Sequence, residues 1–159
     1  MKTISLTQGK FALVDDEDFE RVSRYKWQFG SYGYAVANIW NKNTKTHSHT
    51  RLHRFILNAE RGTQIDHKDL NKLNNTKSNL RFCNTSQNML NAGVYRTNTT
   101  GYKGVYLCKR KKKISWYVQI RYQGKQVFLG IFTDIKKAAQ VYNQAALKYH
   151  GEFARLNNI

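Results

Sequence analysis

The chain has 159 residues, enough for one ordinary domain or two small ones. Its formal net charge is +17, from 27 Lys and Arg against 10 Asp and Glu, and the basic residues alternate with aromatic ones. That pattern predicts a polyanionic partner and favours nucleic acid. No apolar run approaches the roughly 20 residues that span a bilayer, and "MKTISLTQGK" is not a signal peptide, so we expect a cytoplasmic protein with no membrane partner. The isolated Cys83 and Cys108 predict no structural zinc.

The first 58 residues combine β-like runs with a short acidic helix. "FALV" at 11–14 and "YGYAVANIW" at 32–40 predict strands. The acidic segment at 15–23 predicts a helix capped by Asp15, because early acids favour the positive helix N-terminus. "RLHRFIL" at 51–57 is compatible with either a short helix or a strand.

Residues 59–91 are predicted to fold as strand, long loop, strand and helix. "QID" at 64–66 and "LRFC" at 80–83 are the strands, and "TSQNMLN" at 85–91 begins like a helix. Seven of the fifteen asparagines lie between 71 and 91, and asparagine favours turns.

The C-terminal part predicts a small sheet with one helix behind it. Residues 92–101 are small and polar and form the expected linker. Three β-rich runs follow at 104–108, 115–122 and 126–132, and the helix extends from the Asp134 cap to Gly151. In the second strand, alternation places Trp116, Val118 and Ile120 toward the helix, and Tyr117, Gln119 and Arg121 toward a partner.

The sequence "DHKDLNKLNN" at 66–75 contains the residue types that hydrolyse a phosphodiester. The reaction needs a base for water and a cation that holds the phosphate and neutralises the leaving oxygen. His67 is a suitable base near neutral pH, and Asp66 with the amide of Asn79 or Asn88 offers oxygen ligands for magnesium. The alternative interpretation is a polar loop without catalysis.

"LHRFIL" at 52–57 and "IDHKDLNKLNNTKSNLRFCNTSQNMLN" at 65–91 resemble the HNH nuclease motif, and most closely phage and intron-encoded HNH homing endonucleases. The resemblance implies an α+β chain in which a ββα-metal nuclease domain precedes the three-stranded antiparallel sheet and its helix.

The same resemblance implies a role for each matched residue. His67 would be the general base, and Asn79 would orient it. Asp66 and Asn88 would hold one divalent ion per active site, Mg²⁺ or Mn²⁺. His53 and Arg54 have two open interpretations, a phosphate contact or a structural role.

Residues 102–157 resemble the Apetala-two/ethylene-response-factor DNA-binding domain, through "QIR", "FLGIF", "AAQVYNQAA" and "GEFARLN". In that family the sheet lies in the major groove. Gln119 and Gln126 are candidates to read adenine, whereas the lysine run at 109–113 is suited to phosphates. The expected DNA-binding residues are Tyr106, Lys109, Arg110, Lys112, Tyr117, Gln119, Arg121, Gln126 and Phe128.

The resulting interpretation is a DNA endonuclease with an N-terminal nuclease domain (1–91), a linker (92–101) and a DNA-binding domain (102–159). It would hydrolyse double-stranded DNA inside a cell as a phage- or bacterium-encoded homing endonuclease, leaving 5′-phosphate and 3′-hydroxyl ends. It would act as a monomer that nicks one strand or as a homodimer. Two alternatives stay open: a non-catalytic DNA-binding regulator that retains the HNH scaffold, and an RNA-binding protein of the ribosomal type.

Overall fold

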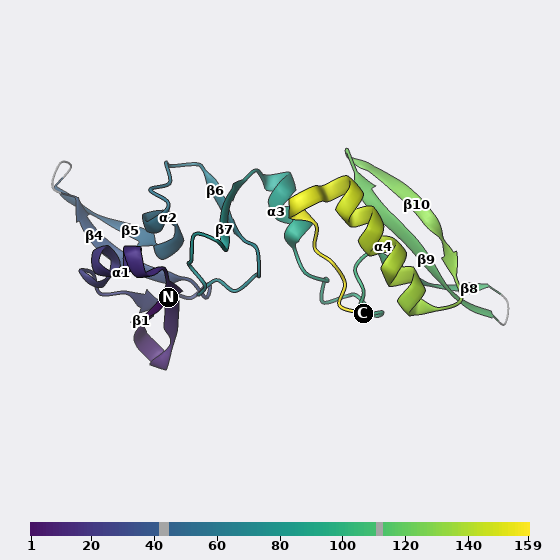
Figure 1. The fold of residues 1–159 in the computed structure, drawn as a ribbon, viewed down its shortest axis with the longest axis horizontal. Helices are drawn as coiled ribbons and strands as arrows, with labels where there is room; N and C mark the ends of the chain where they lie inside the picture. Colours follow the sequence, from purple (N-terminus) through teal and green to yellow (C-terminus); the bar gives the residue numbers. More distant parts are fainter. Residues whose placement is uncertain (42–44, 111–112) are drawn as a thin grey trace. The chain divides into compact units, whose positions relative to one another are not determined.

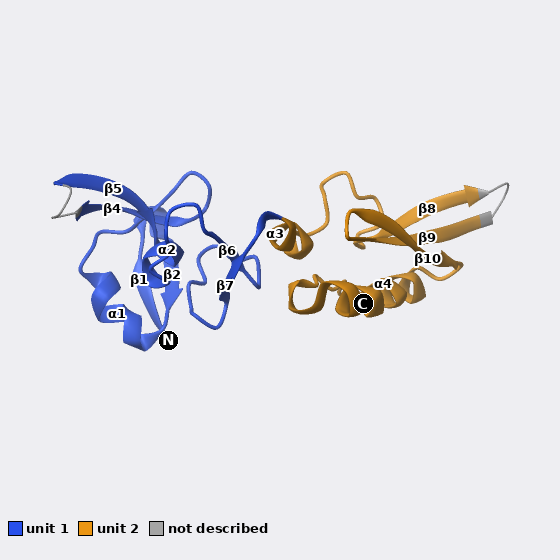
Figure 2. Cartoon of the chain, turned by 90° about the horizontal axis from the view of Figure 1, so that it is seen from above, with its two compact units in different colours: residues 1–85 blue, residues 86–159 orange. Residues whose placement is uncertain are grey.

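The computed structural model describes residues 1–41, 45–110 and 113–159. Its contacts form two compact units, residues 1–85 and 86–159 (Figure 2). The mixture of small sheets and helices is the expected α+β class (Figure 1). From the N-terminus to residue 83, the elements are β1 (Lys2–Ser5), η1 (Thr7–Gly9), β2 (Phe11–Val14), α1 (Asp16–Ser23), β3 (Gln28–Phe29), β4 (Ala35–Asn41), β5 (Thr46–Arg51), α2 (Leu52–Ile56), β6 (Gln64–His67) and β7 (Leu80–Cys83). Those that follow are α3 (Thr85–Asn91), β8 (Val105–Arg110), β9 (Lys113–Tyr122), β10 (Lys125–Phe132), α4 (Ile135–His150) and η2 (Gly151–Phe153). Among the described residues, no helix has the length and apolar character needed to cross a membrane.

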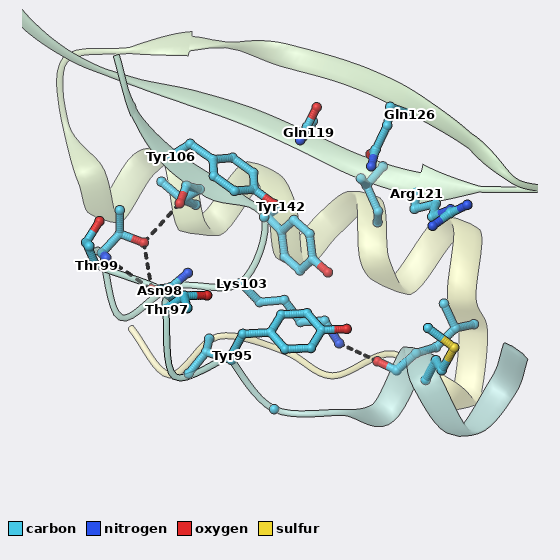
Figure 3. Close-up of a pocket in the computed structure, with 18 of the residues that line it drawn as sticks. Tyr95, Thr97, Asn98, Thr99, Lys103, Tyr106, Gln119, Arg121, Gln126 and Tyr142 are labelled. Atoms are coloured by element: carbon cyan, nitrogen blue, oxygen red, sulfur yellow. Dashed lines mark hydrogen bonds between the residues drawn. The ribbon is translucent and has the colours of Figure 1, made fainter. Parts of the chain in front are cut away.

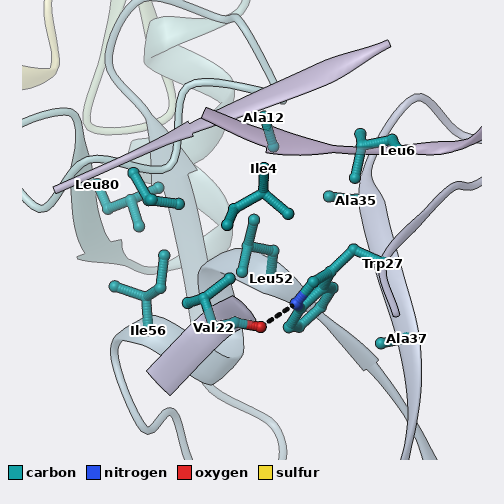
Figure 4. Close-up of a cluster of buried hydrophobic side chains, with 11 residues drawn as sticks. Ile4, Leu6, Ala12, Val22, Trp27, Ala35, Ala37, Leu52, Ile56 and Leu80 are labelled. Atoms are coloured by element: carbon teal, nitrogen blue, oxygen red, sulfur yellow. Dashed lines mark hydrogen bonds between the residues drawn. The ribbon is translucent and has the colours of Figure 1, made fainter. Parts of the chain in front are cut away.

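One hydrophobic core holds the first unit together. The β1–β2 hairpin, the sheet of order β3-β4-β5, and helices α1 and α2 all contribute to it (Figure 4). Trp27 is buried in this core, and its indole N–H donates to the Val22 carbonyl at 2.9 Å, which satisfies its one polar group. Leu80 of β7 packs in the same core, which fixes the strand that pairs with β6.

Helix α1 lies where the acidic segment predicted it, but Asp15 does not cap it through its side chain. The Asp15 carboxylate accepts instead from the backbone N–H of Lys77 at 2.7 Å. The Lys77 ammonium pairs with Glu17 at 2.5 Å and with Asp18 at 3.1 Å. Asp15 therefore occupies the predicted N-cap position, while its carboxylate binds the asparagine-rich loop instead of the first turn of the helix.

The loop at 68–79 joins the antiparallel strands β6 and β7, in the order that the sequence predicted. It is fastened to strand β2 by two backbone hydrogen bonds of 2.8 Å, from Leu13 N to Leu73 O and from Asn75 N to Leu13 O. Because these bonds connect residues about 60 positions apart, the loop is an ordered part of the first unit rather than a free polar segment.

The second unit contains the antiparallel sheet β8–β9–β10 with α4 packed against one face (Figure 1). Trp116, Val118 and Ile120 face α4, which confirms the predicted alternation of β9. The Asp134 carboxylate caps α4 by accepting from Lys136 N at 2.7 Å, and the helix ends before Gly151. Both ends of α4 are therefore where the sequence predicted them.

Gly104 lets the start of β8 approach α4 closely. Its φ is +73°, and a Cβ added there would lie 2.1 Å from the Tyr142 ring and 2.7 Å from the Gln119 carbonyl oxygen. The Gly104 carbonyl accepts from Gln119 N at 3.0 Å. Only glycine combines this backbone conformation with this separation.

The expected linker, residues 92–101, belongs by its contacts to the second unit. The Asn98 side chain accepts from Thr100 N at 3.0 Å and from Gly101 N at 2.7 Å. The Thr100 hydroxyl donates to the Val105 carbonyl at 2.9 Å. The small polar residues that suggested a linker therefore bond the backbone of an ordered turn.

Candidate active site and DNA-binding face

Asp66 and His67 are consecutive residues of β6, and they pair with Arg81 and Leu80 of β7, respectively. Strand alternation predicted that they would diverge unless the strand bent. Both residues stay in the ladder, and the turn comes afterwards, where Leu70 N donates to His67 O at 2.9 Å. Both side chains are buried.

Asp66 forms a buried ion pair with Arg81. The guanidinium donates to Oδ2 of Asp66 from Nε at 2.9 Å and from Nη2 at 2.6 Å. The sequence analysis did not identify Arg81 as part of the site, because its place opposite Asp66 depends on the register of β6 and β7. Any ion bound by Asp66 would share this carboxylate with Arg81.

The Asp66 carboxylate is an oxygen ligand that suits a hard divalent cation. Protein carboxylates alone would not complete the coordination shell of such an ion. Within residues 1–41, 45–110 and 113–159, no three His, Cys, Asp or Glu side chains converge on a common point. Mg²⁺ commonly binds through one or two carboxylates and keeps several water ligands. Asp66 therefore fits as one carboxylate ligand of an ion that keeps water ligands.

His67 is buried and uncharged at neutral pH. Its Nε2 lies 3.4 Å from the Oδ1 of Asn75, a side-chain oxygen that accepts hydrogen bonds. Burial lowers the pKa of His67, while the Asn75 hydrogen bond and the negative charges of Asp69 and Asp66 act in the opposite direction. A neutral imidazole is the form that can take a proton from water.

Two aromatic rings surround His67. The ring of His53, on α2, lies edge-on at a centroid distance of 5.1 Å, and the ring of Tyr34 lies at 6.0 Å. Tyr34 and His53 are 5.1 Å apart. Burial, together with the neighbouring His67, Arg51 and Arg54, lowers the pKa of His53 to about 3. The sequence analysis missed Tyr34, since nothing in its local pattern separates it from the chain's nine other tyrosines.

Two cations lie over the Tyr34 ring. The Arg51 guanidinium lies 4.9 Å from the ring centroid and the Lys72 ammonium lies 4.7 Å from it. Lys72 also donates to the Tyr32 carbonyl at 2.9 Å. The buried histidines are thus bordered by two cations of the kind that bind phosphate.

Asn79 braces the loop that follows His67. Its carbonyl oxygen accepts from Lys68 N at 2.9 Å, and its side-chain oxygen accepts from Asp69 N at 3.0 Å. Its amide group donates to Asp69 Oδ1 at 2.9 Å and to Asn74 O at 2.8 Å. Asn79 therefore acts on the backbone beside His67, whereas the imidazole itself contacts Asn75.

Arg54 is occupied by backbone carbonyls of the 59–63 loop. Its guanidinium donates to Thr63 O at 2.6 Å, to Glu60 O at 2.5 Å and to Ala59 O at 3.3 Å. Of its two open interpretations, these contacts favour the structural role. His53 is 5% exposed, so its ring contacts the site's own side chains.

Asn88, the other expected metal ligand, lies on α3. Residues 86–159 form the second unit, whereas Asp66 and His67 belong to the first. Its role as a ligand therefore remains a prediction.

The outer face of the C-terminal sheet carries six of the expected DNA-binding side chains in cross-strand rows, whereas Lys109 lies in the register of the opposite face. Tyr106 of β8 pairs with Tyr117 of β9, and Gln126 and Phe128 of β10 pair with Arg121 and Gln119. The rings of Tyr117 and Phe128 stack at 5.0 Å. Tyr106, Lys109, Arg121, Gln126 and Phe128 are exposed. Lys112 and the side chain of Arg110 lie outside the described part of the chain.

A pocket of about 520 Å³ borders this face (Figure 3). Gln119, Arg121 and Gln126 line it from the sheet, and Tyr95 lines it from the preceding segment. Lys103 closes its base by donating to Leu90 O at 2.5 Å and Ala92 O at 2.6 Å. Burial, with Arg155 nearby, lowers the pKa of Lys103 to about 8.

Comparison with known proteins identifies two viral relatives. An uncharacterised HNH endonuclease of Acanthamoeba polyphaga mimivirus is 36% identical over 164 residues, which cover 96% of this chain and 77% of that protein. Protein 3.8 of Escherichia phage T7 is 32% identical over 95 residues, or 60% of this chain and 76% of that protein. No family model and no solved structure matches the chain. The length and level of identity to the mimivirus protein show that this chain belongs to the HNH endonuclease family.

Proposed function

We propose that the protein is a metal-dependent DNA endonuclease whose general base is His67. The observation that carries the proposal is the buried, neutral His67 at the end of β6, held beside Asn75 and directly after Asp66 in the strand of an HNH family member. A net charge of +17 supports a DNA substrate.

The residues of the chain divide the reaction among them. His67 takes a proton from the attacking water, whose oxygen forms a bond to phosphorus while the bond to the 3′ oxygen breaks. The 3′ oxygen leaves as an alkoxide that takes a proton from solvent water, so the products carry a 5′ phosphate and a 3′ hydroxyl. A divalent ion, Mg²⁺ or Mn²⁺, held by Asp66 and Asn88 would stabilise the charge on the leaving oxygen. Asn79 positions His67 through the loop backbone.

The second unit would direct the nuclease to its target. The resemblance of residues 102–157 to the Apetala-two DNA-binding domain and the exposed polar and aromatic sheet face support this role. Two tethered binding units raise each other's effective concentration on one duplex. One active site per chain nicks one strand, so a double-strand break needs a homodimer or two events. A long recognition sequence in intracellular DNA would make the protein a homing endonuclease.

The experiment that tests the proposal is a supercoiled-plasmid assay with and without Mg²⁺. We expect relaxed, nicked circles with Mg²⁺ and none with EDTA, and end-labelling should find 5′ phosphates. Wild-type protein that shifts DNA in a gel yet leaves it uncut with Mg²⁺ or Mn²⁺ contradicts the nuclease.

One contact favours a second candidate, a DNA-binding regulator without catalysis. The Arg81 guanidinium already neutralises Asp66, as a retained scaffold would require. The same assay decides between the two functions, because a regulator binds the plasmid but does not nick it.

A further inference from the structure

The exposed face of β8–β10 has an apolar half and an amide half. In the apolar half, Tyr117 lies between Tyr106 on one side and Ile131 on the other, and its ring stacks on Phe128 at 5.0 Å. Tyr106 is 47% exposed, Phe128 56% and Ile131 43%, so this patch faces solvent rather than α4. Aromatic and aliphatic groups exposed together mark a binding surface.

The amide half lies on the same strands. Gln119 is opposite Phe128, and Gln126 is opposite Arg121. Gln126 and Arg121 are exposed. A glutamine side chain presents one donor and one acceptor in a plane, which matches the major-groove edge of adenine.

The charge around this face selects a polyanion as its occupant. Residues 105–132 include seven Lys and Arg and no Asp or Glu. The two acidic residues of the second unit are Asp134, which caps α4, and Glu152 in η2, so both belong to the helical layer. The exposed cations Lys109, Arg121 and Lys125 are suited to phosphates, but phosphate contacts leave the apolar half of the face without a matching group on the DNA.

On duplex DNA, the apolar group that reaches the major groove is the 5-methyl of thymine. Tyr117 and Phe128 cover one face of each other's ring, which leaves less ring surface for stacking on unpaired bases. The pattern therefore suits a paired target more than a single strand.

We propose that this sheet face reads an A·T-rich duplex, with Phe128, Tyr117 and Tyr106 against thymine methyl groups and Gln119 and Gln126 against adenine. The inference rests on the proposed function, because it names the DNA sequence class that the second unit of the nuclease recognises.

The test uses full-length His67→Ala protein in EDTA, so that the DNA stays uncut. Selection from random duplexes provides a bound sequence, which we expect to be A·T-rich. Its affinity is then measured with thymine and with uracil, which lacks the methyl group. We expect uracil to weaken binding about fourfold for each methyl group that the face buries.

Two further variants assign the effect to the sheet face. Adding Phe128→Ala should remove most of the difference between thymine and uracil. Adding Leu147→Ala should leave that difference unchanged, because Leu147 is equally exposed, at 56%, but lies on α4.

Each remaining result has a separate meaning. Specific binding that is equal for thymine and uracil overturns this inference alone, and so does tighter binding to the single strand. Failure to bind any duplex overturns the DNA-binding role of the second unit as well, whereas the plasmid assay tests the nuclease separately.

Discussion

At the scale of residues, the proposed chemistry depends on the neighbouring buried rings of His53 and His67. They lie 5.1 Å apart, and burial lowers the pKa of both. A charge on either ring would be close to the other and to the cations Arg51 and Arg54. Both rings therefore stay neutral at neutral pH, which keeps His67 available as a base.

The depressed pKa of His53 predicts a loss of stability in acid. An unfolded histidine titrates near 6.5, whereas folded His53 titrates at about 3, so the unfolded state binds more protons between these values. The stabilising effect is complete above pH 6.5 and disappears as the pH falls toward 3. We expect protonation of His53 in the unfolded state to lower the free energy of unfolding by about 2–3 kcal/mol between pH 7 and pH 4.5.

Urea unfolding of wild type and His53→Gln at both pH values measures this effect. The variant should be less stable at pH 7 but should lose about 2–3 kcal/mol less than wild type on acidification. The exposed His49 provides the control, since His49→Gln should keep the wild-type pH dependence. If acidification lowered the free energy of unfolding equally in wild type and His53→Gln, His53 would not be buried as a neutral group.

The sequence predicted which residue types would form the site more readily than which side chains they would contact. Asp66, His67 and Asn79 were proposed from their residue types and from the resemblance to the HNH motif, but Arg81, Tyr34 and Asn75 were not. Arg81 reaches Asp66 through strand register, and Tyr34 reaches His67 across 33 positions of sequence. Asn75 resembled a turn residue like its neighbours, and only its burial beside His67 distinguishes it.

At the scale of elements, local periodicity was sufficient to predict a helix or strand wherever one face of that element is buried. The alternation of β9 and both ends of α4 were predicted because each depends on residues close in sequence. The 92–101 segment was predicted to be a linker from its small polar residues, but Asn and Thr favour both free loops and hydrogen-bonded turns. Only the hydrogen bonds that the Asn98 side chain accepts and the Thr100 hydroxyl donates separate the two cases.

The contact between Gly104 and Tyr142 predicts a sharp effect on the second unit. We expect Gly104→Ala to destabilise it by about 2–4 kcal/mol, from backbone strain at positive φ and from overlap with the Tyr142 ring. Gly124→Ala is the matched control, because Gly124 has φ +77° but no atom within 4 Å of its added Cβ. It should lose only about 1 kcal/mol. Thermal unfolding followed by near-ultraviolet circular dichroism compares them, and equal losses would rule out the proposed close packing.

At the scale of the whole molecule, positive charge is concentrated in the second unit. Residues 86–159 contain 13 basic and 2 acidic residues, a net +11, whereas residues 1–85 contain 14 and 8, a net +6. The acids of the first unit include the α1 cluster that pairs with Lys77. The second unit is therefore the stronger candidate for tight DNA binding, and the first for chemistry.

This division predicts that binding and cleavage can be separated. We expect Arg121→Ala to weaken binding by roughly 1–3 kcal/mol while leaving single-turnover cleavage at saturating enzyme unchanged. Lys136→Ala, which removes an exposed cation from α4 behind the sheet, should affect affinity much less. Gel-shift titration and quenched-flow cleavage measure the two quantities. A comparable loss of the saturated cleavage rate in Arg121→Ala would contradict the division.

The central claim is that His67 is the base of a nuclease, and its most direct test is His67→Ala in the Mg²⁺-dependent plasmid assay. We expect nicking to fall by about 10²- to 10⁴-fold while DNA affinity stays within error of wild type. His49→Ala, which removes an exposed histidine of the same unit, should nick normally. Undiminished nicking by His67→Ala, or a loss of affinity as large as the loss of nicking, would contradict the assignment.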